Sequence, residues 1–174
     1  DVSKIATSVP IRFDADISAN AARTISKIKN DHVFQFDVET TQNGAANVAI
    51  FTHETDATAT TSHSLTINVI DSVTATGTDN LLDTESFDFR DFNTVNLDVG
   101  AETINFDADV VGRDVDKYVV TGSGTIDFTG GLNLQGNTAT SAAATEFDAS
   151  GMTGTVTGYT LNGDNHVAEI VKTG

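Results

Sequence analysis

Apolar and polar residues alternate with a period of two along much of the chain. In the segment His32–Glu39, Val33, Gln35 and Asp37 point one way and the residues between them point the other. This alternation is typical of a half-buried β-strand. It predicts strands at Val9–Asp14, His32–Glu39, Ala46–Thr52, Ser64–Ile70, Thr94–Val99, Thr103–Phe106, Lys117–Thr121, Thr125–Phe128, Leu132–Leu134 and Val156–Leu161.

Residues 18–31 are the one segment that favours a helix. Ser18 is a suitable N-cap residue, and Ala21, Ala22, Ile25 and Ile28 fall near helical spacing. The sequence therefore predicts an all-β protein with at most one short helix.

A change of pattern divides the chain into two expected units. Asn43-Gly44 is a turn signal between two strand segments, so residues 1–73 are expected to form a small antiparallel, β-sandwich-like unit. A polar cluster from Ala75 to Asn80 separates it from residues 74–174, where short strands alternate with turns.

A short phrase, an aromatic residue followed closely by aspartate, returns through the second unit. The steps Phe89→Phe106, Phe106→Phe128 and Phe128→Phe147 are 17, 22 and 19 residues. A period near twenty is typical of stacked-repeat proteins, in which each unit buries its apolar face against its neighbours. We therefore expect a parallel, β-solenoid-like fold for residues 74–174, with a second antiparallel sandwich as the alternative.

The composition excludes several classes of site and partner. The net charge of −16 makes nucleic acid a poor partner, because phosphate binding needs clustered Lys and Arg. The absence of Cys removes disulfides and thiolate metal sites. We find no apolar run long enough for membrane insertion and no signal-peptide-like start, and we expect a segment of a longer protein.

The acids are mostly aspartates, 19 against 6 Glu, and aspartate favours turns and ion binding. The pattern Asp-x-Asp recurs at Asp14/Asp16, Asp107/Asp109 and Asp114/Asp116. Residues that are two positions apart on a strand lie on the same face, so the two carboxylates converge. Ca²⁺ takes six to eight oxygen ligands from carboxylates, carbonyls and water. We predict a Ca²⁺ site at Asp107, Asp109, Asp114 and Asp116, with exposed turn acids as the alternative.

The histidines suggest a metal site or general base only weakly. His53 and His63 are ten residues apart in a Thr-rich segment, which matches no compact ligand spacing, and His32 and His166 are isolated. We interpret them as exposed loop histidines and expect no enzyme active site.

Two phrases resemble bacterial surface-layer (S-layer) and RTX-type secreted proteins. Phe147-Asp148-Ala149-Ser150-Gly151-Met152-Thr153-Gly154-Thr155-Val156-Thr157 is similar to their "Asp-Ala-Ser-Gly-x-Thr-Gly-x-Val-Thr" phrase. Residues 83–89, followed by Thr94-Val95-Asn96-Leu97, are similar to another of their segments. The resemblance covers about residues 74–160 and lacks the tandem nonapeptide repeats that bind calcium in that family.

This resemblance implies a calcium-dependent, β-rich protein that is secreted by a type I system and self-assembles at the cell surface. The leading hypothesis is a structural segment of a surface lattice whose partner is itself. An adhesin module that binds cell-surface polysaccharide or protein is the alternative. A β-helical polysaccharide lyase is the third hypothesis, with Arg90 and Arg113 as its basic residues, although the nine bases of the chain form no cluster.

Overall fold

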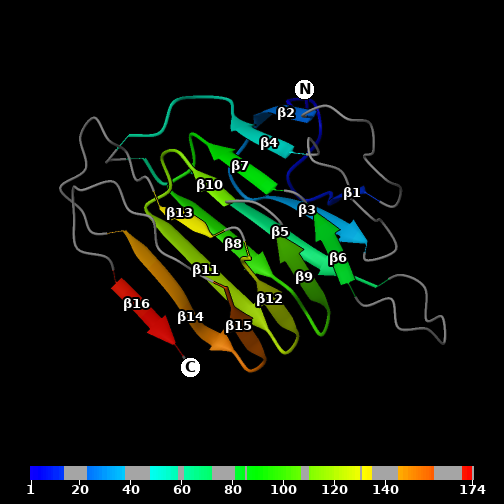
Figure 1. Ribbon diagram of the computed structural model, residues 1–174. Coiled ribbons are helices and arrows are strands. Elements are labelled where there is room, and N and C mark those ends of the chain that lie inside the picture. The colour runs from blue at the N-terminus through cyan, green and yellow to red at the C-terminus, as the bar shows by residue number, and fades with distance from the viewer. Residues whose placement is uncertain are drawn as a thin grey trace.

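The computed structural model is an all-β protein (Figure 1). It describes residues 1–13, 23–37, 48–58, 61–71, 81–84, 86–106, 110–129, 131–134, 145–158 and 170–173. Within these ranges there is no helix, and hence none that would be long and apolar enough to cross a membrane.

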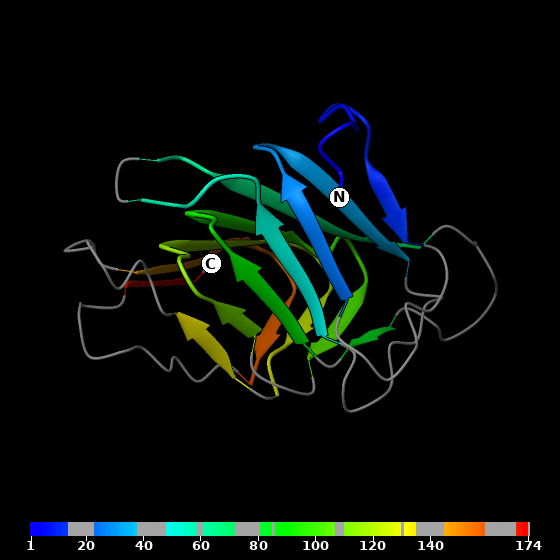
Figure 2. The same cartoon turned by 90° about the horizontal axis from the view of Figure 1, so that it is seen from above.

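The strands form three sheets, and every pair of neighbouring strands is parallel. Figures 1 and 2 show strands side by side in the sheets, and Figure 1 shows the two termini at opposite ends of the stack. Sheet A has seven strands in the order β1 (Ile11–Phe13), β3 (His32–Asp37), β5 (Ser64–Ile70), β8 (Thr94–Asp98), β11 (Lys117–Gly122), β14 (Glu146–Met152) and β16 (Ile170–Thr173).

Sheet B has five strands and sheet C has four. Sheet B has the order β13 (Leu132–Leu134), β10 (Val110–Gly112), β7 (Ser86–Arg90), β4 (Val48–His53) and β2 (Arg23–Ile28). Sheet C has the order β15 (Thr155–Thr157), β12 (Thr125–Asp127), β9 (Thr103–Phe106) and β6 (Leu81–Thr84). From β6 to β15 the chain visits sheets C, B and A in rotation, so each sheet gains one strand per circuit.

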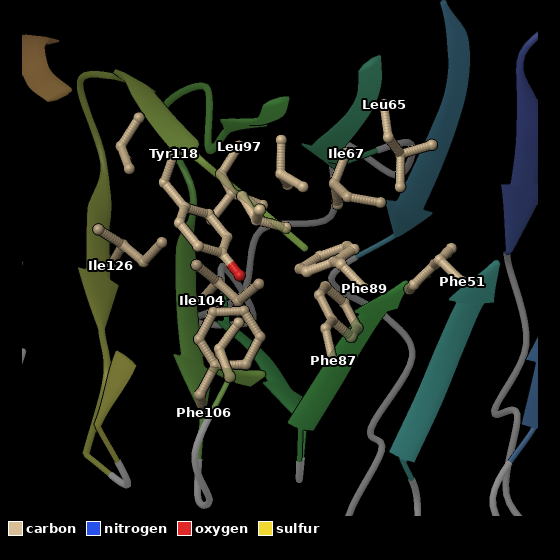
Figure 3. Close-up of a cluster of buried hydrophobic side chains, with 14 of the residues drawn as sticks. Phe51, Leu65, Ile67, Phe87, Phe89, Leu97, Ile104, Phe106, Tyr118 and Ile126 are labelled. Carbon is tan, nitrogen blue, oxygen red and sulfur yellow. The ribbon is translucent and has the colours of Figure 1, made fainter. Parts of the chain in front are cut away.

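Residues of alternate strand positions fill the space between the sheets (Figure 3). One row of sheet A contains Leu65, Val95, Tyr118 and Phe147, joined by the strand registers and all almost fully buried. The interior is rich in phenylalanine, and Phe106 and Phe128 stack with ring centroids 5.5 Å apart. Each of the ten predicted strands overlaps an observed strand, because a period of two is a local property that does not depend on what the strand pairs with. Of the predicted strand Val156–Leu161, only the first two residues belong to β15, and residues 159–161 lie outside the described residues.

The predicted helix is wrong where the structure describes it. Residues 18–22 lie outside the described residues, and Arg23–Ile28 form β2. The register with β4 shifts between Ile25 and Ile28, and Lys27 there has φ of 58°. This bulge turns two isoleucines that are three residues apart toward the same core, which imitates helical spacing.

The antiparallel pairing expected for the first unit is also wrong. β3 pairs with β5 and β2 pairs with β4, both in parallel. The predicted turn Asn43-Gly44 lies outside the described residues. The strands before and after it, β3 and β4, belong to different sheets and do not form a hairpin. β4 pairs with β7 and β5 with β8 across the expected boundary near residue 73, and the division into two units stays a prediction.

Candidate functional site

A row of polar residues lies at the start of sheet A, one residue before each of four successive strands. The registers of β5, β8, β11 and β14 place these residues side by side. They are His63, Asn93, Asp116 and Thr145, of which Asp116 is half-buried and the others are buried.

Asn93 is the centre of this row because all its hydrogen-bonding groups are used on both sides. Its Oδ1 accepts the Thr61 hydroxyl at 2.6 Å and the His63 backbone N–H at 3.1 Å. Its Nδ2 donates to the Thr58 carbonyl and to Asp116 Oδ2, both at 3.0 Å. Asn93 therefore ties together three successive passages of the chain through this edge of the sheet.

Carboxylates gather beside Asn93. Asp91 has φ of 65°, and its backbone N–H donates to Asp114 Oδ2 at 3.3 Å. Burial raises the pKa of Asp114, the Asp91 N–H opposes this, and the carboxylates of Asp91, Asp116 and Asp56 raise it further. We call His53, Thr55, His63, Asp91, Asn93, Asp114 and Asp116 the polar corner.

The structure brings together half of the predicted Ca²⁺ ligands. Asp114 and Asp116 lie in the polar corner, whereas Asp107 and Asp109 lie outside the described residues, as do Asp14 and Asp16. Asp116 Oδ1 is buried and accepts no hydrogen bond from the described residues, and a cation would satisfy such an acceptor. Among the described residues, however, no group of three or more His, Asp or Glu is arranged to hold a metal. A Ca²⁺ ion at Asp114 and Asp116 would therefore need further oxygen ligands.

The prediction that the histidines are exposed is wrong for the three that are described. His53 and His63 are only 7% and 8% exposed and stack on each other. His32 is fully buried; its Nδ1 accepts the Lys29 backbone N–H at 3.1 Å, and its Nε2 lies 3.3 Å from the Ile5 carbonyl. His166 lies outside the described residues.

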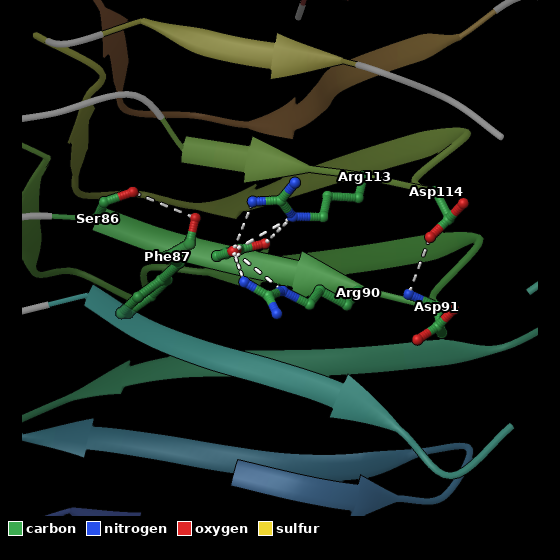
Figure 4. A network of polar contacts seen from close by, with 7 residues as sticks. Ser86, Phe87, Arg90, Asp91, Arg113 and Asp114 are labelled. Atoms are coloured by element: carbon green, nitrogen blue, oxygen red, sulfur yellow. Dashed lines mark hydrogen bonds and ion pairs between the residues drawn. The ribbon is translucent and has the colours of Figure 1, made fainter. Parts of the chain in front are cut away.

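Two arginines next to the polar corner form a structural ion-pair network on the outer side of β7 (Figure 4). Arg90 Nη2 lies 2.7 Å from Asp88 Oδ2, and Arg113 Nε lies 3.2 Å from Asp88 Oδ1. Asp88 is buried, and these contacts balance its charge. The bases considered above for a lyase groove are thus both directed at one carboxylate.

A short sequence repeat marks the residues of the polar corner. The period-two alternation of the strands does not reveal it. Arg90-Asp91-Phe92-Asn93 and Arg113-Asp114-Val115-Asp116 share the pattern Arg-Asp-apolar-Asx, 23 residues apart. This distance equals one circuit of the chain, since Asp88 of β7 is paired with Val111 of β10. The apolar member is fully buried in both copies. Each copy therefore directs one arginine to Asp88 and two polar residues to the corner.

No known family model, no curated protein and no solved structure matches this chain.

Proposed function

We propose that this chain is a structural segment of a secreted bacterial surface-layer protein of the RTX type. In this proposal the three sheets form a β-solenoid that self-assembles into a surface lattice in a calcium-dependent manner and has no catalytic role. The sequence phrases that resemble this family and the parallel strand arrangement both support it.

The observation that carries the proposal is where hydrophobic side chains are exposed. Among the described residues, the exposed large hydrophobics are Ile5 at 36%, Val9 at 53% and Val171 at 42%. Val171 lies in β16, and Val9 lies two residues before β1. β1 and β16 are the two edge strands of sheet A.

Val171 continues an interior row of sheet A. Its register partner is Phe147, which is 1% exposed, and the row extends through Tyr118 and Val95 to Leu65. Exposure thus rises from 1% to 42% in one strand step. An apolar position of this kind, on an edge strand with backbone groups open to pairing, favours addition of another strand.

Such an addition would join unlike ends. The β16 edge of one copy would receive the β1 edge of the next, which gives a heterologous contact that propagates instead of closing. The charge of −16 opposes association, and a divalent cation would offset this repulsion. Asp107, Asp109, Asp114 and Asp116 remain the proposed source of ligands.

Sedimentation velocity with calcium and with chelator tests the proposal. We expect the parent chain to form larger particles with calcium as protein concentration rises. Val9→Lys and Val171→Lys should each remain monomeric because each loses one end of the contact. An equal mixture of the two should form dimers, since each variant retains the end that the other lacks.

Thr94→Lys is the matched control, because it adds the same charge to a central strand of sheet A. This variant should assemble like the parent chain. A parent chain that stays monomeric with calcium at every concentration would contradict self-assembly. Assembly that both valine variants retain would instead place the contact elsewhere.

An adhesin module is the second candidate, favoured by the outer face of sheet A. Thr66 and Asn96 are register partners there, and Asn96 Nδ2 lies 3.4 Å from Thr66 Oγ1. Regular rows of hydroxyl and amide groups suit the hydroxyls of a polysaccharide. Calorimetric binding of cell-surface polysaccharide by a monomeric chain would favour this candidate over self-assembly.

A further inference from the structure

Two histidines from different sheets stack face to face in the polar corner. His53 is the last residue of β4, and His63 immediately precedes β5. Their ring centroids are 3.7 Å apart with an interplanar angle of 20°, and both side chains are more than nine-tenths buried. Phe92 packs edge-on against His53 at 5.4 Å. The pair therefore joins both ends of the β4–β5 connection to the turn between β7 and β8.

Both ring nitrogens of His63 have a partner. His63 Nδ1 lies 3.0 Å from the Asp91 carbonyl oxygen, which can only accept, so Nδ1 carries the proton. His63 Nε2 lies 3.4 Å from the Thr55 hydroxyl, which can donate to it. Both nitrogens of a neutral His63 are thus satisfied.

Within the described part of the chain, His53 has hydrogen-bond partners on one side of its ring only. Its Nδ1 lies 3.2 Å from the Thr55 backbone N–H, 3.2 Å from the Thr55 hydroxyl and 3.0 Å from the Thr55 carbonyl. Its Nε2 is buried and makes no hydrogen bond with the described residues. A protonated His53 carries an N–H on both nitrogens, so at least one of them would be buried without an acceptor there.

We propose that the stacked pair His53–His63 is an acid-sensitive latch that holds the β4–β5 connection against the β7–β8 turn. Taking up a proton places a positive charge in a buried site against a second imidazole. The protonated His53 ring also holds at least one buried N–H that has no acceptor among the described residues. Mild acid therefore opens the latch, and the connection detaches from Asn93, to which Thr58 and Thr61 bind. This inference does not depend on the proposed function.

Burial of His53 sets the direction of the effect. Burial lowers the pKa of His53, and the neighbouring His63 lowers it further. The Thr55 backbone contact and the carboxylates of Glu54 and Asp91 raise it, but burial is the larger influence. A lowered pKa means that the latch contributes its full stability above about pH 6.5, the ordinary histidine value, and loses it as pH falls below that value.

The acids of the corner act in the opposite direction. Asp91, Asp56 and Asp116 face Asp114, whose raised pKa favours the protonated form in the folded protein. Asp114 therefore adds stability at low pH that is lost as pH rises through its folded pKa. This loss runs from the ordinary carboxylate value near pH 4 up to the raised folded pKa of Asp114. Because Asp114 adds stability as pH falls and the histidine pair loses it, the sign of the pH effect distinguishes the two processes.

Amide hydrogen exchange from about pH 7.5 to 5.0, a range that spans the ordinary histidine pKa, tests the latch in the unmodified chain. The Thr55 amide, which lies against His53, and the His63 amide, which donates to Asn93, report opening of the two ends of the connection. If opening takes up one proton, their protection factors should fall about tenfold for each pH unit between the folded and open pKa values. The Val95 amide in the central strand β8 should keep its protection.

Matched variants separate the pair from the other histidines. The double variant His53→Gln/His63→Gln should show protection that does not depend on pH in this range, whereas His32→Gln should retain the fall. An NMR titration of the parent histidine rings should show His53 still neutral at about pH 6.5, the ordinary histidine pKa, and below it. Constant protection of Thr55 and His63 in the parent chain, or a charged His53 at that pH, would overturn the latch.

Discussion

At the scale of single residues, a large core side chain in one sheet is matched by a small one in the other. Phe89 of β7 and Gly112 of β10 are register partners in sheet B, and Val95 and Tyr118 are partners in sheet A. In one circuit of the chain the large Phe89 of sheet B comes with the small Val95 of sheet A. In the next circuit the small Gly112 of sheet B comes with the large Tyr118 of sheet A. A Cβ on Gly112 would overlap the Tyr118 hydroxyl and lie 2.9 Å from Val115 Cβ. Gly112 is therefore needed for close approach and not for backbone freedom.

We predict that Gly112→Ala lowers the free energy of unfolding by about 1–3 kcal/mol, the range of overpacked cores. Tyr118→Phe should leave the chain no less stable, because the Tyr118 hydroxyl is buried without a partner among the described residues. When Tyr118→Phe is already present, Gly112→Ala should cost less, since the nearest clashing atom is gone, although the Val115 contact remains. Urea unfolding of the parent, the two single variants and the double variant measures the coupling, and additive effects would contradict the contact.

Residue-level pattern predicted strands such as β3, β5 and β8, but neither β2, where a helix was expected, nor the polar corner. Alternation along β3 or β5 is a property of adjacent residues, so the strands could be predicted directly. The contact of Asn93 with Asp116 joins residues 23 positions apart and depends on strand register. The exposure of His53 and His63 was misjudged for the same reason: the loop is polar, but Phe92 and the facing ring bury both.

At the scale of elements, only one step of the aromatic-aspartate phrase follows the strand register. Phe89 lies in sheet B, Phe106 and Phe128 lie in or directly after strands of sheet C, and Phe147 lies in sheet A. Only the step Phe106→Phe128 joins equivalent positions, as the register of β9 with β12 shows. Gly154, in the phrase of residues 147–157, is explained by close packing and not by the aromatic period. A Cβ there would overlap the carbonyl oxygen of Gly124 in the turn stacked against it.

We predict that Phe106→Ala and Phe128→Ala each lower the free energy of unfolding by about 3–5 kcal/mol. Both rings are fully buried, and they stack with an interplanar angle of 12°, so truncation of either leaves a cavity against the other. Phe13→Ala is the control, because Phe13 is only partly buried on the edge strand β1 and should cost less. Equal urea midpoints for all three variants would contradict this account of the core.

At the scale of the whole molecule, uncompensated negative charge is the dominant electrostatic feature. Lys117 and Lys172 share Glu146 on the outer face of sheet A, and Arg90 and Arg113 share Asp88. Arg12 pairs with Asp37. Several of the nine bases are thus bound to particular acids, while Asp91, Asp114 and Asp116 meet in the polar corner. We propose a divalent cation as the counter-charge for this corner.

We predict that calcium raises the melting temperature and that Asp116 takes part. A ligand that binds only the folded chain adds about 2.7 kcal/mol at a hundredfold excess over its Kd. Asp116→Asn should be at least as stable as the parent in chelator, because it keeps an acceptor for Asn93 and removes one carboxylate from beside Asp114. It should gain less from calcium than the parent.

Asp127→Asn is the control, because it removes the same charge from β12, outside the corner, and should respond like the parent. Thermal melts at fixed ionic strength, with millimolar calcium or chelator, distinguish these outcomes. Equal melting temperatures in both conditions would reject calcium coupling. An equal calcium response in the parent and both variants would accept the coupling and place the ion away from Asp116.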